Sequence, residues 1–212
     1  FEPDDKAYLR LLDRQRSLDL THQVNIGLVH AAILASHLRH GFQDLYKRDI
    51  VLMREDNVPD YPCLCFAVTV LVRGFSSAEF SNPWDSPYRF AADNGLDLKS
   101  LDDYLNVLDR IFQKAKAAGA VCLKTTLAYE RTLDFANVPK ERAAKAFGHA
   151  REKLTESERK DFEDYIMWRL VELSARYDLP FQIHTGQARI QGSNPMLLVD
   201  MIAAKPNTKF IL

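Results

Sequence analysis

Two polar side chains stand at the ends of apolar runs in the second half of the sequence. His184 follows the run "PFQI", and Lys124 follows the run "AVCL". If both runs are strands of one parallel sheet, their carboxyl ends lie at the same edge, where parallel α/β folds bind ligands. Neutral imidazole is the commonest metal ligand in proteins, so His184 is a candidate metal ligand. The alternative is a histidine that is hydrogen-bonded within a strand-end turn.

Lys124 occupies the corresponding place on the preceding strand. A lysine at the inner end of such a strand is costly to bury unless its charge is paired or chemically modified. Lys124 is therefore a candidate catalytic residue, which could bind a substrate carboxylate or form a carbamate that holds a metal. A lysine whose ammonium extends outward into solvent would explain the same position equally well.

Three residues that follow these strand ends are candidate substrate ligands. Tyr129 and Arg131 come after the strand that carries Lys124, and Gln187 comes after His184, where it could line the mouth of a site. The guanidinium of Arg131 could hold a carboxylate by a two-pronged contact. An arginine in such a loop more often bonds a helix end or loop carbonyls, so both roles remain open.

The other histidines and the cysteines give weaker signals. One apolar helical segment carries four histidines, His22, His30, His37 and His40. It has no HExxH motif and no accompanying acidic residue, which favours a partly buried polar helix face over a metal site. The cysteines lack the CxxC pairs of a zinc clip and are interpreted as buried, reduced thiols, which fits a cytoplasmic protein: Cys63, Cys65 and Cys122.

The elements that must position these residues alternate between helix and strand after a helical N-terminal region, residues 1–60. Amphipathic spacing and capping residues predict helices over residues 100–119, 141–155, 155–180 and 194–206. Apolar runs predict strands over 120–129, 181–186 and 208–212. The run 63–75 is interpreted as a strand, although a buried helix would look similar, and 76–98 as a loop.

This alternation predicts an α/β fold with parallel strands, either an eight-fold β/α barrel or a doubly wound sheet. No strand is followed by GxGxxG or GxxxxGK[ST], which counts against a nucleotide-binding doubly wound fold. Polar residues at the carboxyl ends of the strands favour the (β/α)8 TIM barrel. We expect residues 1–212 to form a single barrel domain, with the β/α units in 61–212.

The composition indicates a small-molecule partner more than a macromolecular one. The 28 Lys and Arg residues balance 29 Asp and Glu residues, which gives no sign of a nucleic-acid or membrane partner. No run reaches the roughly 18 apolar residues that a membrane helix needs. Because the sequence starts with Phe1 and ends on the strand-like "TKFIL", we expect it to belong to a longer chain, with the barrel incomplete here.

Three segments resemble the amidohydrolase superfamily. "AKAAGAVCLKTTLAYERTLDF", "LSARYDLPFQIHTGQAR" and "NPMLLVDMIAAKPNTKFIL" follow one another in the order and spacing of its "amidohydrolase 2" branch. That branch includes the amidohydrolase domain found fused to glutamine synthetase, with strands of the types "GFKS.xAYRxGL" and "PxQIHTG" and an "NPxLL" helix. The resemblance covers about residues 100–212.

The resemblance implies a distorted β/α barrel that binds one or two divalent metals, most often zinc, with manganese as an alternative. It makes His184 the metal ligand of the fifth strand, and Lys124 a substrate contact or the site of a carbamate. Arg131 matches the arginine of the "AYR" motif, although Glu130 is inserted before it. The family's HxH pair would lie upstream of Phe1, its sixth-strand histidine after Leu212, and its eighth-strand aspartate further on.

The activity that the resemblance implies is metal-dependent hydrolysis, in which a metal-activated water attacks an amide or related bond of a small carboxylate-bearing substrate. A metal-dependent decarboxylase and a uronate-type isomerase share the fold and stay open as alternatives. A non-catalytic barrel that has lost its metal ligands is the third. The expected partner is the small-molecule substrate, and self-association into a homo-oligomer is left open.

Overall fold

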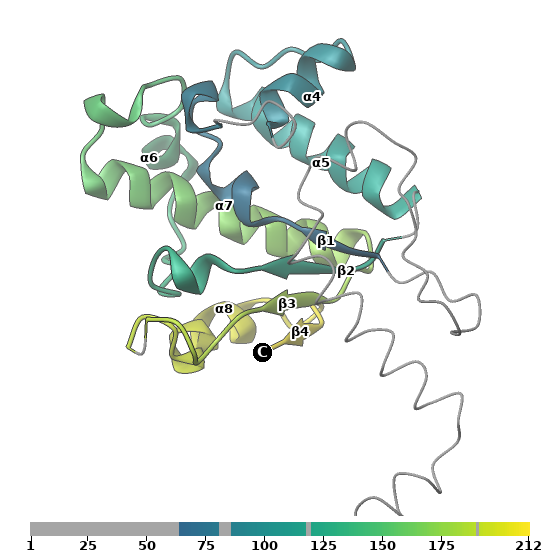
Figure 1. Cartoon of the computed structure of the whole chain (residues 1–212), viewed down its shortest axis with the longest axis vertical. Coiled ribbons are helices and arrows are strands. Elements are labelled where there is room, and N and C mark those ends of the chain that lie inside the picture. The colour runs from purple at the N-terminus through teal and green to yellow at the C-terminus, as the bar shows by residue number, and fades with distance from the viewer. Residues whose placement is uncertain (1–63, 81–85, 118–119, 190) are drawn as a thin grey trace, which may run out of the picture.

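Short apolar runs form the strands of one parallel sheet in the computed structural model, which describes residues 64–80, 86–117, 120–189 and 191–212. The strands are β1 (Leu64–Ala67), β2 (Ala120–Thr125), β3 (Phe181–Ile183) and β4 (Phe210–Ile211). They lie in the order β1-β2-β3-β4, and each neighbouring pair is parallel (Figure 1). The predicted α/β fold with parallel strands is confirmed.

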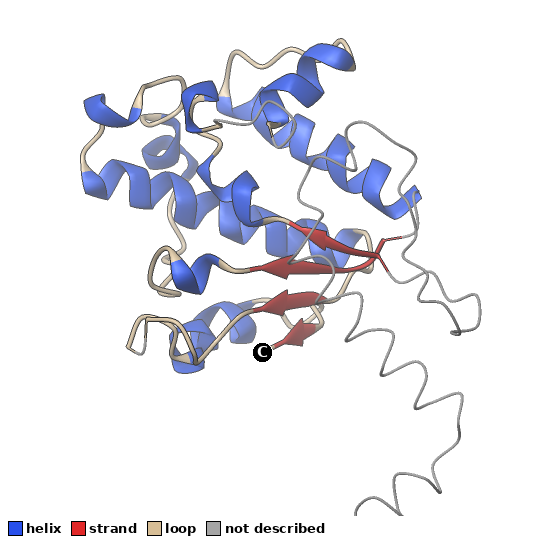
Figure 2. Cartoon of the chain, viewed as in Figure 1, coloured by secondary structure: helices blue, strands red, loops and turns tan. Residues whose placement is uncertain are grey.

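Helical segments connect the strands (Figure 2). The α-helices are α4 (Pro87–Asp93), α5 (Leu101–Ala117), α6 (Lys140–Ala144), α7 (Glu156–Arg176) and α8 (Val199–Ala204). The 3-10 helices are η1 (Thr69–Arg73), η2 (Ser77–Glu79), η4 (Leu127–Tyr129), η5 (Arg151–Lys153) and η6 (Pro195–Leu198). No helix among these described segments is long and apolar enough to cross a membrane.

The two long helices start where their capping residues predict. Thr155 accepts a hydrogen bond from the backbone N–H of Glu158, whose carboxylate accepts one from Thr155 N–H at 2.9 Å, so α7 begins with a capping box. Ser100 and Asp103 make the same reciprocal contacts at the start of α5. Both predicted helices are confirmed.

The core lies between the sheet and the helices α5 and α7, which are on one side of it in Figure 1. Phe66 of β1 meets Phe112 of α5 edge to face, with ring centroids 6.0 Å apart. Phe181 and Ile183 of β3 are both buried in the same cluster. Because strand side chains alternate between faces, the residue between them, Gln182, points to the opposite face.

Several predicted elements differ in the structure, and the predicted strand 120–129 ends at Thr125 before the 3-10 helix η4. The run 63–75 is not one strand, because β1 ends at Ala67 and the chain turns into η1. The segment 76–98 contains η2 and α4, which begins at Pro87, a residue suited to a first helical turn. The segment 141–155 is not one helix, because α6 ends at Ala144. Before η5 begins, Gly148 takes a left-handed φ of +83° and donates its N–H to Phe75 O at 2.7 Å.

The remaining predictions concern the final strand, the N-terminal region and the cysteines. The final strand is confirmed as β4 but is not buried, because Ile211 and Leu212 are 41% and 52% exposed. The predicted helical region over residues 1–60, with its histidines, lies outside the described residues, as does Cys63. Cys122 is a buried, reduced cysteine, as predicted.

Candidate functional site at the carboxyl edge of the sheet

Lys124 and His184 lie at the carboxyl ends of neighbouring strands. The backbone N–H of His184 donates to Thr125 O at 3.0 Å, which continues the β2–β3 ladder by one residue beyond β3. Lys124 pairs in register with Gln182, so by alternation both residues and His184 belong to the face opposite Phe181 and Ile183. Lys124 is 5% exposed, which rules out a lysine that extends into solvent, and it makes its own contacts.

The structure brings Tyr129, His184 and Gln187 together. The Tyr129 ring stacks on the His184 imidazole, with centroids 4.6 Å apart and planes 25° from parallel. His184 Nε2 lies 3.0 Å from Gln187 O, a distance at which an Nε2–H donates to that carbonyl. In that tautomer the lone pair on Nδ1 is available to a ligand. Gln187 therefore contributes its backbone carbonyl here, and its side chain is exposed.

A closed loop holds this cluster in place. Gly186 adopts a left-handed φ of +82°, which permits the chain to turn directly after His184. Its N–H donates to Ser193 O at 2.8 Å, and the Ser193 hydroxyl donates back to Gly186 O. The loop is fixed to the segment after β2, because Leu133 N–H donates to Gly192 O at 2.8 Å. Loops of two successive β/α units are thus joined beside His184.

Sequence reasoning missed a cluster of threonines at the same edge. Thr69 Oγ1 accepts the N–H of Thr126 at 2.9 Å and lies 3.1 Å from the hydroxyl of that residue. Thr125 Oγ1 lies 3.4 Å from Thr69 Oγ1. The pair "TT" directly after Lys124 was the available signal. These hydroxyls join the start of η1 to the end of β2.

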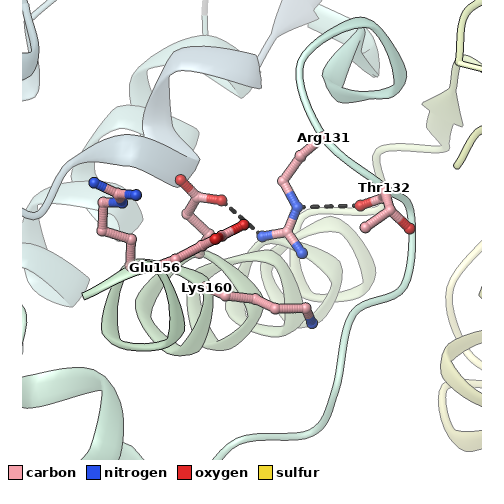
Figure 3. Close-up of a pocket in the computed structure, with 6 residues that line it drawn as sticks. Arg131, Thr132, Glu156 and Lys160 are labelled. Carbon is pink, nitrogen blue, oxygen red and sulfur yellow. Dashed lines mark hydrogen bonds and ion pairs between the residues drawn. The ribbon is translucent and has the colours of Figure 1, made fainter. Parts of the chain in front are cut away.

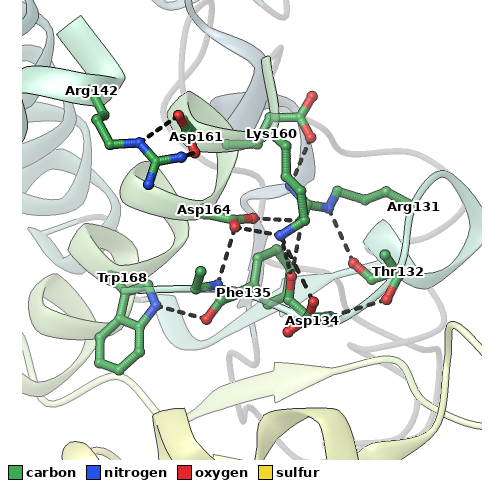
Figure 4. Close-up of polar contacts among 11 residues, drawn as sticks. Arg131, Thr132, Asp134, Phe135, Arg142, Lys160, Asp161, Asp164 and Trp168 are labelled. Carbon is green, nitrogen blue, oxygen red and sulfur yellow. Dashed lines mark hydrogen bonds and ion pairs between the residues drawn. The ribbon is translucent and has the colours of Figure 1, made fainter. Parts of the chain in front are cut away.

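Arg131 holds a loop rather than facing this cluster. Its Nη1 bonds Glu163 at 2.7 Å and its Nη2 bonds Asp164 at 2.5 Å, both on α7 (Figure 4). Its Nε donates to Thr132 O at 3.1 Å and its Nη2 also to Asp134 O at 3.2 Å. The second role considered for this arginine, bonding loop carbonyls, is the one seen here. A role in binding substrate stays a prediction.

Lysine and tryptophan side chains of α7 complete the attachment of this loop. Lys160 pairs with Asp164 at 2.6 Å, and Asp164 accepts the N–H of Ala136 at 3.1 Å. Trp168 Nε1–H donates to Phe135 O at 3.0 Å. Asp164 is 1% exposed, and a buried carboxylate is costly unless it is paired. Here Arg131, Lys160 and the N–H of Ala136 compensate its charge.

A pocket of about 190 Å³ lies beside this network (Figure 3). It is lined by Arg131, Thr132, Glu156, Arg159, Lys160 and Glu163. Burial raises the pKa of the Glu163 carboxyl, against the attraction of Arg131, which lowers it. Because Arg131 and Lys160 already pair with carboxylates of α7, we regard the pocket as belonging to the loop attachment and not as the candidate site.

The described residues fit one position of a metal centre and no more. His184 offers an imidazole at the strand end, but no group of three or more His, Cys, Asp and Glu residues in the described ranges could hold a metal ion. Any further ligands would have to come from outside these ranges.

Comparison with known proteins supports the fold. No model of a protein family matches the sequence. No curated protein matches it either. The structure is similar to the uronate isomerase of Thermotoga maritima, with a TM-score of 0.55 and 18% identity over 73% of this chain. The match spans 38% of that enzyme's length, so this chain corresponds to well under half of it.

Two further solved structures are similar over shorter stretches. A protein described as a metal-dependent hydrolase from Lactobacillus casei matches 58% of this chain and 35% of its own, with 22% identity and a TM-score of 0.45. The glucuronate isomerase of Caulobacter crescentus matches 62% of this chain and 26% of its own, with 19% identity and a TM-score of 0.47. Both scores are below 0.5, so the fold comparison depends on the Thermotoga enzyme.

Proposed function

We propose that this chain supplies the central β/α units of a (β/α)8 barrel enzyme of the amidohydrolase superfamily, within its amidohydrolase 2 branch. The proposed activity is metal-dependent hydrolysis of an amide or related bond in a small carboxylate-bearing substrate. The observation that carries it is the position of His184, which follows β3 at the sheet edge and on the face that it shares with Lys124. In parallel β/α folds this edge forms the active site.

The roles of the chain's own residues follow from their positions. His184 would ligate a divalent metal, zinc or alternatively manganese, which lowers the pKa of a bound water when present. Lys124, buried at the same edge, would hold the substrate carboxylate through its ammonium group. Tyr129 and Gln187 would fix the imidazole plane through the stacking contact and the carbonyl contact. The other metal ligands would lie outside the described residues.

A uronate-type isomerase is the second candidate. The fold similarity to the Thermotoga uronate isomerase favours it, and the same edge residues would serve either reaction. A screen of amides, lactones and uronates with zinc or manganese present would separate the two activities.

The test of the proposal is the metal content of the full-length protein. The His184→Ala variant should lose most of its bound metal and its turnover, because an imidazole ligand is removed. The control is His149→Ala, since His149 is exposed in the turn before η5. Full metal occupancy in His184→Ala, measured by plasma mass spectrometry, would sink the assignment.

A further inference from the structure

The side-chain oxygen of Gln182 is a buried acceptor with no donor among the described residues. Its Oε1 is closed off from solvent and accepts no hydrogen bond from any residue that the structure describes. A buried polar group left in this state costs stability, because its hydration is lost and not replaced. Native proteins contain few buried polar groups without a hydrogen-bond partner, and a functional role is one explanation for such a group.

The position of Gln182 places this acceptor beside the proposed substrate anchor. Gln182 is the middle residue of β3, between two side chains that enter the core. Its register partner on β2 is Lys124, and neighbouring strands lie about 4.8 Å apart. Lys124, Gln182 and His184 therefore form one polar stripe on a single face of two adjacent strands.

We propose that Gln182 is a specificity-determining residue, whose Oε1 accepts a hydrogen bond from a substrate hydroxyl or N–H adjacent to the carboxylate that Lys124 holds. This inference rests on the proposed function, because it takes Lys124 as the carboxylate anchor. Gln182 as a whole is only partly buried, so its terminal amide can turn toward a ligand about a soft torsion. The substrate class is a carboxylic acid with a hydroxyl or amide N–H on the neighbouring carbon.

The proposal predicts that the side-chain oxygen of Gln182 contributes to substrate preference but not to the stability of the ligand-free fold. If the oxygen bonded the protein, its removal would destabilise the ligand-free fold. Because it has no described donor, replacing the amide by the similarly shaped, apolar Met side chain should leave the ligand-free fold as stable or more stable. The same change should remove the preference for substrates that carry the donor.

The experiment measures melting temperature and affinity of the full-length protein with mandelate and with phenylacetate, which differ by one hydroxyl. The unmodified protein should bind mandelate about tenfold more tightly, which corresponds to one hydrogen bond. Gln182→Met should bind both acids equally and keep its ligand-free melting temperature. Gln113→Met, a change on the exposed surface of α5, should retain the preference.

Three results would overturn the proposal: equal binding of the two acids by the unmodified protein, a preference that survives in Gln182→Met, or a ligand-free melting temperature lowered by several degrees in that variant. Binding is read here without turnover or metal content. The loss or survival of metal in His184→Ala is therefore a separate outcome, and the two proposals can fail independently.

Discussion

At the scale of the residue, Arg131 shows how much a side chain's role depends on its neighbours. In the sequence it follows a strand end, where it could bind a carboxylate of substrate or hold the loop. In the structure its three guanidinium nitrogens all contact α7 carboxylates or loop carbonyls, and the side chain is 13% exposed. No sequence pattern indicated Glu163 and Asp164 as its partners, because they lie 32 and 33 residues away.

Arg131→Ala should therefore destabilise the protein by about 3 kcal/mol, because it leaves the buried carboxylate of Asp164 with less compensation. Urea unfolding of the full-length variant measures this change. The control is Arg142→Ala, which removes a more exposed pair with Asp161 and should cost less than about 1 kcal/mol. Equal small losses in both variants, with substrate affinity lost only in Arg131→Ala, would instead favour a substrate role.

At the scale of the element, helix α7 is the support on which the loop after β2 rests. It supplies Glu163, Asp164 and Lys160 to the Arg131 network and Trp168 to the carbonyl of Phe135. Its start is fixed locally by the capping box at Thr155.

Thr155→Ala should lower the free energy of unfolding by about 1 kcal/mol, because the N-cap acceptor is lost. Thr155→Ser keeps the hydroxyl and should retain most of that stability. The comparison is made by thermal and urea unfolding of the two variants. If Ser and Ala are equally destabilising, the loss comes from the methyl group's packing and the cap contributes nothing.

Local signals account for which elements could be predicted. Helices α5 and α7 were predictable because caps and apolar periodicity agree at Ser100 and Thr155. The run 63–75 was wrongly predicted as one strand because its apolar residues continue past Ala67. The strand ends there, and η1 begins at Thr69, which is hydrogen-bonded to Thr126, a residue distant in the sequence. Pro87 indicated the start of the short helix α4, but a helix of seven residues within a polar segment shows too little apolar periodicity to be predicted.

At the scale of the whole molecule, the candidate site exists because parallel strands carry their ends to one edge. Lys124 and His184 could be named from strand-end positions alone, since this rule depends on topology and not on contacts. Their relation to Tyr129 and Gln187 could not, because it depends on the left-handed turn at Gly186 and on the loop closed by Ser193. The orphan oxygen of Gln182 likewise appears only once the sheet is assembled.

The role of His184 as a metal ligand is tested most directly by the position of the metal in crystals of the full-length protein grown with zinc. Anomalous scattering at the zinc edge should place an ion about 2.0–2.1 Å from the His184 imidazole, bound through Nδ1 because Nε2 faces Gln187 O. It should lie at the carboxyl edge of β2 and β3, on the face shared with Lys124. A fully occupied zinc ion bound elsewhere, with His184 uncoordinated, would show that His184 is not a metal ligand.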